Sequence, residues 1–451
     1  MNIVIDCERL FDGQEVIEDV TVIIEGERIV AVHQKKELST GNLGEGQRMG
    51  CRFAMPGLID SHVHVGGYHE GFPGGAPFQP AVNFLRLLVY NGVTTVRDTG
   101  NSIETIKYLR EWGEKYSGPR VFSSGPLLDL PPLTWPFSRI VRNPETARHE
   151  VELLHLEGMN FIKTYRNVTP EILKAIVEAA DSCGMGVAAH VEKTSAREAC
   201  ELGVKSLEHV VNLFNDRDFP DLEGKTLAGA TGCARLWSHV DPKSEAVTAL
   251  LHLLRANQTY VCPTLLVSHR YCSLEAMVND PYLDYMVAVM PYHKYFKRMR
   301  DPMGRAIGAK FMRNYMPLPS LSKSERAEVA AGLQNMRDVT SRLHDAGVNL
   351  VTGTDSPNPS VVPGFSLHQE MELMVRSGMP PLAVLRSATS AAGKVLGRDD
   401  LGVVKPGACA DMVLLNADPA ANILNTMHIQ GVIKAGRLVD RKKVRRIFRK
   451  T

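Results

Sequence analysis

The chain has 451 residues and nearly balanced charge, with 52 lysines and arginines against 50 aspartates and glutamates. With 44% apolar residues it can bury a large core, and its length exceeds that of one small module. A net charge of +2 argues against nucleic acid as the main partner, because phosphate-binding domains are usually strongly basic. No run of about 18 apolar residues occurs, so no membrane span is expected.

The eight cysteines are scattered along the chain without a C-x-x-C pair. A disulfide framework or a cysteine-type zinc site is therefore not expected. The first residues also lack the basic and apolar segments of a signal peptide. Together these features predict a cytoplasmic protein.

Both ends of the chain contain short β-branched and apolar runs that are typical of strands. Such runs occupy residues 20–24, 28–32, 411–415 and 431–434. We expect the two ends to pair into one small β-sandwich domain, formed by residues 1–55 and 397–451. The basic residues within 441–450 are interpreted as a solvated tail of this domain.

The middle of the chain, residues 56–396, alternates short apolar runs with helical patterns. Eight candidate strands lie at residues 57–64, 93–97, 120–123, 160–164, 186–190, 204–209, 260–265 and 348–354. Between them lie amphipathic stretches such as 170–183, in which apolar residues recur on one helical face. Eight β/α units in series predict an α/β protein with a (β/α)₈ TIM barrel.

The first candidate strand of this barrel ends in an H-x-H pair, His62 and His64. Because residues two apart on a strand point the same way, both imidazoles are expected to face the mouth of the barrel, where active sites are built. Two adjacent imidazoles suit a metal such as zinc. Taken alone, an H-x-H pair is equally compatible with two ordinary polar residues.

Four further candidate strands end in a titratable side chain. These side chains are Lys163, His190, His209 and Asp355. Because the carboxyl ends of barrel strands meet at one face, we expect the four to converge with the H-x-H pair. Five strand ends that each supply a nitrogen or oxygen ligand predict a metal centre.

With these residues in place, the chain resembles the amidohydrolase superfamily over nearly its whole length. The segments 388–392 (ATSAA) and 407–414 (GACADMVL) extend the likeness toward the C-terminus. Within the superfamily, the Ile-Lys motif and the Gly-Thr-Asp-Ser-Pro strand end are most similar to the branch of Xaa-Pro and Xaa-Arg dipeptidases. That branch also contains enzymes acting on carbamates and ureas.

The resemblance implies a centre of two divalent metal ions. The ligands would be His62, His64 and Asp355 for the first ion, His190 and His209 for the second, and Lys163 between them. Lys163 would have reacted with CO₂ to give an N6-carboxylysine, although a lysine paired with a carboxylate is the alternative. Zinc is the expected metal, and manganese, cobalt or iron would also suit these ligands.

The implied reaction is hydrolysis of a C–N bond in an amide, dipeptide, carbamate or urea. A hydroxide activated by the two metals would attack the carbonyl, with Asp355 as general acid and base. One alternative is a mononuclear aminohydrolase or cyclic-amide hydrolase on the same fold, against which Lys163 counts. A second alternative is a non-catalytic scaffold of this fold, against which the complete ligand set counts.

Three residues are candidates for binding the substrate. Tyr165 follows Lys163 by two residues and could hydrogen-bond a carbonyl, Arg166 could hold a carboxylate, and Trp135 could contact an apolar group. Each also has an ordinary reading, respectively core packing, surface solvation and loop packing. The related dipeptidases tend to carry Ser/Thr-Gly-Gly after the lysine strand, so the substrate stays open.

Two further expectations concern regions outside the ligand set, and two concern partners. The loop 66–80 should hang over the barrel mouth, and His368 could orient a ligand. The expected partner is a small-molecule substrate, with neither nucleic acid nor a membrane. Self-association into a homo-oligomer would be ordinary for this fold.

Overall fold

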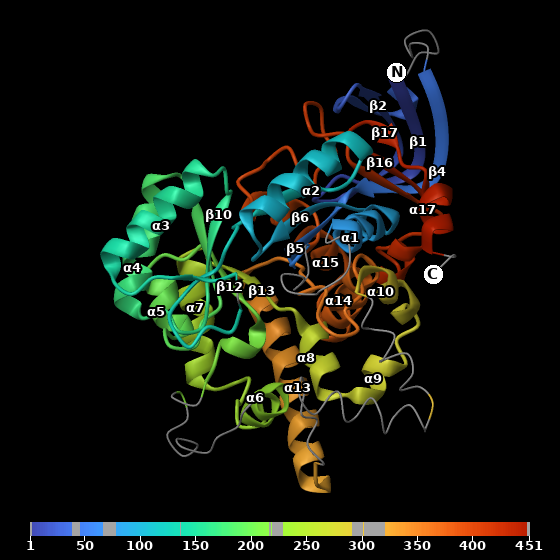
Figure 1. The fold of residues 1–451 in the computed structure, drawn as a ribbon. Coiled ribbons are helices and arrows are strands. Elements are labelled where there is room, and N and C mark those ends of the chain that lie inside the picture. Colours follow the sequence, from blue (N-terminus) through green and yellow to red (C-terminus); the bar gives the residue numbers. More distant parts are fainter. Residues whose placement is uncertain are drawn as a thin grey trace.

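The structure is a computed structural model of the whole chain (Figure 1). It describes residues 2–37, 46–65, 78–135, 137–215, 218, 229–290, 301 and 321–448. A mixed sheet built from both ends of the chain adjoins a larger part in which parallel strands alternate with helices. None of the helices in these ranges combines the length and the apolar character that a bilayer crossing needs.

Strands from the two ends of the chain form one seven-stranded sheet, in the order β17-β16-β15-β4-β1-β2-β3. Its strands are β1 (Asn2–Phe11), β2 (Val16–Glu25), β3 (Arg28–Gln34), β4 (Gly46–Pro56), β15 (Met412–Leu415), β16 (Ile429–Lys434) and β17 (Arg437–Leu438). Strand β4 joins the two ends, because it pairs in parallel with β1 and antiparallel with β15. The sheet has its own apolar cluster, to which both ends contribute.

The prediction that the two ends pair into one β unit agrees with this sheet, which lies at the upper right of Figure 1. The described strands of this unit form a single sheet, so the second layer of a sandwich is not seen among them. The basic tail is not a loose terminus as far as it is described, since it forms helix α17 (Arg441–Phe448). Its Val444 and Ile447 pack on the central core, and Arg441 donates to two backbone carbonyls.

The parallel strands of the middle of the chain form two sheets. One is β5-β6-β7, and the other has the order β14-β13-β12-β11-β10-β8-β9. The strands are β5 (Leu58–Val63), β6 (Val93–Asp98), β7 (Arg120–Ser123), β8 (Leu128–Asp129), β9 (Arg139–Ile140), β10 (Phe161–Thr164), β11 (Gly186–Ala189), β12 (Ser206–Glu208), β13 (Tyr260–Cys262) and β14 (Asn349–Leu350). This alternation with helices and the parallel pairing are consistent with the predicted TIM-barrel fold.

The strands do not pair continuously around a closed barrel, because pairing is interrupted between β14 and β5 and between β7 and β10. Beyond β14 the backbone pairs irregularly: the N–H groups of Thr354 and Asp355 both donate to the carbonyl of His62. Asp355 also has a positive φ of 59°, which regular strands do not adopt. Backbone bonds still cross both interruptions, among them those from Ser61 N–H to Thr352 O and from Asn160 N–H to Ser123 O.

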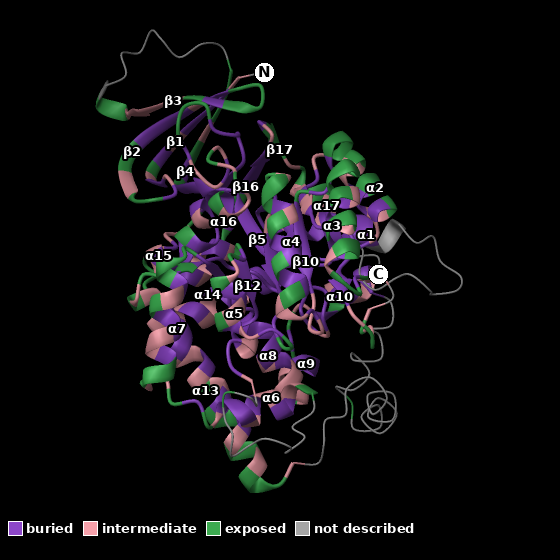
Figure 2. Cartoon of the chain, turned by 90° about the vertical axis from the view of Figure 1, so that its left-hand side faces the viewer, coloured by how far each residue is buried: buried purple, intermediate pink, exposed green. Residues whose placement is uncertain are grey.

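Helices cover the outside of these strands, as Figure 2 shows by their green outer faces around the buried strands. They are α1 (Phe78–Tyr90), α2 (Ile103–Tyr116), α3 (Pro144–Leu156), α4 (Pro170–Ser182), α5 (Ala196–Glu201), α6 (Gly229–Trp237), α7 (Glu245–Ala256), α8 (Leu265–Cys272), α9 (Leu274–Val278), α10 (Leu283–Val289), α13 (Lys323–Asp345), α14 (Phe365–Arg376), α15 (Pro381–Ser387) and α16 (Ser390–Val395). Short 3₁₀ turns are η1 (Lys35–Glu37), η2 (Val210–Asn212) and η6 (Ile423–Met427).

Local sequence explains where several helices begin. The Thr169 side chain caps α4 by accepting from the N–H of Ile172, and Pro170 follows at the first helical position, where its missing N–H costs nothing. Asn143 caps α3 in the same way ahead of Pro144. The predicted helix over residues 170–183 is therefore confirmed as α4.

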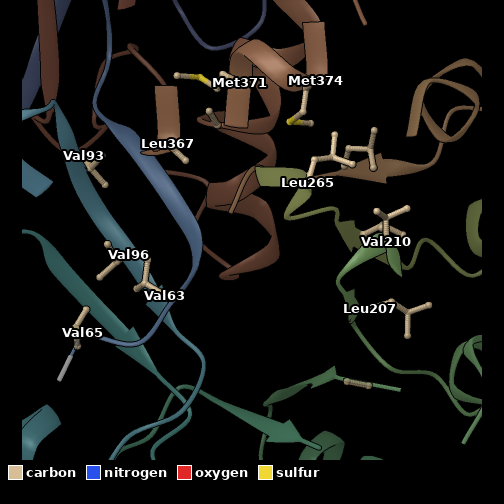
Figure 3. Packing of buried hydrophobic residues seen from close by; sticks show 14 of the residues in the cluster. Val63, Val65, Val93, Val96, Leu207, Val210, Leu265, Leu367, Met371 and Met374 are labelled. Carbon is tan, nitrogen blue, oxygen red and sulfur yellow. The ribbon is translucent and has the colours of Figure 1, made fainter. Parts of the chain in front are cut away.

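The core lies between the parallel strands and the surrounding helices. Figure 3 shows part of it, with side chains from β5, β6, β12, α8 and α14 directed into one cluster. The labelled side chains are Val63, Val65, Val93, Val96, Leu207, Val210, Leu265, Leu367, Met371 and Met374. This packing holds the carboxyl ends of the strands in fixed positions, and those ends carry the candidate ligands.

Candidate metal centre

All the side chains predicted as metal ligands line one cavity of about 200 Å³. They come from β5 and β10 and from the segments that follow β5, β11, β12 and β14. The side chains are His62, His64, Lys163, His190, His209 and Asp355. The expected convergence at the carboxyl ends of the strands is therefore seen, while their roles as ligands remain a prediction.

A glycine allows the segment after β14 to approach the H-x-H strand closely. A Cβ atom at Gly353 would lie 2.5 Å from Cys262 Sγ and 2.7 Å from His62 Cβ, closer than side chains tolerate. The backbone then turns at Asp355, whose N–H donates to the His62 carbonyl at 2.8 Å. As a result Asp355 Oδ1 lies 3.3 Å from His64 Nε2 and 3.6 Å from His62 Nε2.

Imidazole rings from three strands face one another in the cavity. The ring centroids of His62 and His209 are 4.6 Å apart, and those of His190 and His209 are 4.9 Å apart. Ligand atoms of His62, His209 and Asp355 all lie within 4.8 Å of one another, a grouping able to hold a metal ion. These side chains are nitrogen and carboxylate donors, the set that zinc and similar divalent ions prefer.

The two histidines after β11 and β12 are suited to metal binding because their rings are neutral. Burial lowers the pKa of His209 to about 3 and holds the pKa of His190 well below its ordinary range. Both rings are thus neutral near pH 7, as metal ligation requires. Nδ1 of His190 is also buried without a hydrogen-bond partner in the described structure, which is costly unless something else occupies its lone pair.

Lys163 is almost fully buried, with 1% of its surface exposed. Its amine donates to the carbonyl of Thr164 at 3.3 Å, and no carboxylate in the described part of the chain lies within ion-pair distance of it. Burial lowers the pKa of Lys163 to about 8. The alternative of a lysine paired with a carboxylate therefore has no support among the described residues, and an amine that neutralises easily can react with CO₂.

Asp355 is ionised in this setting. Burial raises the pKa of its carboxyl, but the hydrogen bond from His64 and the nearby His62 and His209 outweigh burial and lower the pKa to about 2. An ionised carboxylate can bind a cation and can accept a proton. Asp355 is therefore chemically able to act both as a metal ligand and as a general acid and base, the two roles predicted for it.

Of the three candidate substrate residues, two line the cavity and one does not. Tyr165 and Trp135 are in the lining, and the Tyr165 ring lies 4.4 Å from the ring of His190. Burial raises the pKa of Tyr165 to about 12, so its hydroxyl keeps its proton and can donate. Arg166 forms a two-bond ion pair with Glu192, at 2.7 and 2.8 Å, which favours its ordinary reading as a surface side chain.

A profile of the amidohydrolase family matches residues 53–439 of the chain. The chain belongs to the amidohydrolase family. The resemblance derived from the strand-end residues is thereby confirmed, and so, at the level of the family, is the prediction of an enzyme acting on C–N bonds.

Individual relatives of this amidohydrolase match over limited stretches. The chain is 41% identical over 102 residues to imidazolonepropionase of Cutibacterium acnes, which is 22% of this chain and 26% of that protein. It is 31% identical over 207 residues to ochratoxinase of Aspergillus niger, or 35% of this chain and 43% of that one. The matches thus span less than half the length of either relative.

The fold of this amidohydrolase is similar to that of a solved Xaa-Pro dipeptidase with methionine bound in its active site. The two structures superpose with a TM-score of 0.67 over 97% of this chain and 100% of the other, at 22% identity. The likeness is one of fold.

Sequence reasoning missed the side chains that orient the histidines of this amidohydrolase. His62 Nδ1 lies 2.6 Å from Glu208 Oε2, and His209 Nδ1 lies 2.8 Å from the hydroxyl of Thr264. Glu208 is in turn paired with Arg97 at 2.6 Å. The sequence did contain one signal for these contacts. Arg97 and Glu208 are charged residues inside otherwise apolar strands, and buried charges are rare unless they are paired.

Two further expectations have different outcomes. Residues 66–77 of the loop expected over the mouth lie outside the described residues. His368 does not line the cavity but packs elsewhere in the core, with its ring nitrogens 2.8 Å from Thr426 Oγ1 and 3.1 Å from the Asn91 carbonyl oxygen. Because both of its ring nitrogens are engaged in these contacts, it does not orient a ligand of the cavity.

The buried His368 should make the fold sensitive to acid. Burial lowers its pKa from 6.5 to about 4, so the unfolded chain takes up this proton at a higher pH than the folded protein. The free energy of unfolding should accordingly fall by up to about 3 kcal/mol as pH drops from 6.5 through 4. Urea titrations at several pH values should show a weaker dependence in His368→Gln. The exposed His149→Gln on α3 is the control and should keep the wild-type dependence.

Proposed function

We propose that this protein is a metal-dependent amidohydrolase that cleaves a C–N bond with two divalent ions and Asp355 as general acid and base. One observation carries the proposal: the six predicted ligands, spread over almost 300 residues of sequence, line a single cavity. Unrelated polar residues have no physical reason to gather at five strand ends. The non-catalytic alternative is disfavoured for the same reason.

The donor chemistry of the cavity fits two ions. His62, His64 and Asp355 would hold one, and His190 and His209 the other, with a carboxylated Lys163 between them. The buried, unpaired Nδ1 of His190 and the buried Lys163 without a described carboxylate partner are the observations that favour this arrangement. A bound divalent ion supplies Lewis acidity, which makes a water more acidic and polarises a carbonyl oxygen.

The protein's own groups would handle the proton and the substrate. Asp355, ionised beside His64, would accept a proton from the attacking water and return it to the leaving nitrogen. The protonated hydroxyl of Tyr165 would donate a hydrogen bond to the substrate carbonyl. Trp135 lines the same cavity and would contact the body of the substrate.

Much of the remaining wall of the cavity is apolar. It includes Leu127, Val211, Ala230, Val267 and Met336. A cavity of roughly 150 Å³ accommodates a benzene ring, so about 200 Å³ has room for one ring and the amide group. We therefore propose an amide, dipeptide, carbamate or urea that carries an apolar group, as a small-molecule substrate.

The finer description of the fold is also a proposal. The order of strands and helices supports a (β/α)₈ barrel at residues 56–396, completed across the two interruptions, with a β domain from residues 1–55 and 397–451. Zinc as the metal, a cytoplasmic location, and a homo-oligomer without nucleic acid or membrane partners complete the proposal.

The test is a substrate screen with defined metal content. Metal-free protein and protein loaded with zinc, manganese or cobalt are assayed against N-acyl amino acids, dipeptides, aryl ureas and carbamates. We expect hydrolysis of at least one class, lost with a chelator and restored as the metal content approaches two ions per chain. Full activity at one ion per chain would favour the mononuclear alternative. No hydrolysis with any metal would contradict the proposal.

A further inference from the structure

We propose that Glu208 and Arg97 form a positioning pair that sets the tautomer of His62 and so prepares its Nε2 nitrogen to bind a metal ion. This inference rests on the proposed function, since it takes His62 as a ligand. It assigns a role to two buried charged residues that do not line the predicted substrate cavity.

The contact between Glu208 and His62 is short and enclosed. Glu208 Oε2 lies 2.6 Å from His62 Nδ1, and the two side chains are 0% and 1% exposed. The other carboxylate oxygen, Oε1, accepts from Arg97 Nη2 and from the hydroxyl of Ser206, both at 2.6 Å. Both oxygens of Glu208 are thus engaged in directional bonds, which leaves the carboxylate no freedom to turn.

Arg97 is held as firmly as the carboxylate it neutralises. Its Nε donates to the backbone carbonyl of Ser61 at 2.6 Å, and Nη1 lies 2.9 Å from the Ser206 hydroxyl. With 3% of its surface exposed, the guanidinium cancels the charge of Glu208 inside the core. A buried ion pair persists only when its remaining hydrogen-bonding groups are satisfied in this way.

The arrangement determines which nitrogen of His62 carries the proton. A carboxylate that already accepts from Arg97 and Ser206 is an acceptor only, so the proton of neutral His62 lies on Nδ1 and is donated to Glu208. Nε2 then presents its lone pair on the side of Asp355, whose Oδ1 is 3.6 Å away. An anionic acceptor at Nδ1 also makes the imidazole a stronger donor toward a metal.

The neighbouring histidine shows that the charge is specific to His62. His64 Nδ1 lies 3.1 Å from the carbonyl oxygen of Gly100, which is a neutral acceptor, and its Nε2 lies 3.3 Å from Asp355 Oδ1. The two members of the H-x-H pair are therefore oriented by different groups. Of the two groups that face Nδ1, only that of His62 is a side chain and can be altered by substitution.

Glu208→Gln tests whether Glu208 sets the tautomer of His62 or only fills space, because it keeps the shape of the side chain. Its amide oxygen would take the bonds from Arg97 and Ser206, which turns its NH₂ group toward His62 Nδ1. That nitrogen must then accept, and the proton moves to Nε2, where it blocks metal binding. Glu370→Gln is the control, because Glu370 is an equally buried side chain that, among the described residues, accepts from the backbone N–H groups of Leu265 and Leu266 and contacts no histidine.

The first readout needs no metal. Nitrogen NMR of the metal-free full chain with ¹⁵N-labelled histidine distinguishes the two tautomers, and His62→Asn assigns the signals. We expect Nδ1–H in the wild-type protein and in Glu370→Gln, and Nε2–H in Glu208→Gln. Finding Nε2–H in the wild-type protein would overturn the inference without any variant.

The second readout is zinc affinity, measured by competition with a coloured chelator. Glu208→Gln should bind zinc about 10- to 100-fold more weakly, while Glu370→Gln keeps the wild-type affinity. A tautomer change with unchanged affinity would contradict the inference. A wild-type protein with the expected tautomer that binds no zinc would leave the orientation correct but contradict the proposed function, so the two failures are distinguishable.

Discussion

Lys163→Ala is expected to lose bound metal and hydrolytic activity together. In the proposed centre the Lys163 amine would react with CO₂ to give a carbamate and a released proton, and this anionic group would help to hold the metal ions. Alanine removes that group from a site whose lysine is 1% exposed and has no carboxylate within ion-pair distance among the described residues. Elemental analysis after dialysis should therefore find less than one ion per chain, with activity lowered by at least about 100-fold.

The control for Lys163→Ala is Lys205→Ala, which removes an exposed lysine outside the cavity. It should retain both metal and activity. Lys163→Glu, which offers two carboxylate oxygens on a shorter side chain, should recover part of the metal. A carbamate signal after exposure of the wild-type protein to ¹³C-labelled CO₂ would support the bridge directly. A Lys163→Ala protein with full metal and full activity would rule it out.

Asp355→Asn is expected to lower kcat strongly while removing less metal than Lys163→Ala does. Asparagine keeps one oxygen that can face a cation, but it cannot accept a proton from water or return one to the leaving nitrogen. General acid–base groups contribute roughly 10²- to 10⁴-fold to rate, so kcat should fall by that factor. The acidic limb of the pH–rate profile, if Asp355 produces it, should vanish in the variant.

The control for Asp355→Asn is Asp129→Asn. Asp129 is a buried carboxylate at the same end of the strands, where it accepts from Asn167, but it does not line the cavity. Because asparagine can still accept from the backbone N–H of Asn167, this variant should keep kcat within a few-fold. Equal losses of activity in both variants would show that Asp355 acts through stability and not through proton transfer.

Most elements of the middle of the chain could be predicted from local sequence. Strand β7 has the predicted bounds, and α4 differs from its prediction by one residue, because apolar runs and helix caps are local signals. The last predicted strand, 348–354, was overestimated, since β14 ends at Leu350. The irregular pairing with His62 that shortens it depends on a distant segment, which no local pattern reveals.

The candidate site, like the fold, could be predicted from the sequence only in part. The six ligand candidates could be predicted because each follows an apolar run, so their positions along the chain imply a common face. Arg166 was a weaker candidate, and its pairing with Glu192, 26 residues away, could not be foreseen. The roles of Glu208 and Arg97 were invisible for the same reason, because their partners come from other strands.

The near-neutral composition argued against nucleic acid as the main partner, and the strand-end residues indicated the family and its chemistry. Those conclusions depend on residue type and spacing, which the sequence states directly. Only the tertiary structure decided which imidazole nitrogens face the cavity, that Arg166 is paired outside it, and that His368 belongs to the core. These are consequences of contacts between segments far apart in the chain, and hydrogen bonds of about 3 Å cannot be inferred without the folded arrangement that creates them.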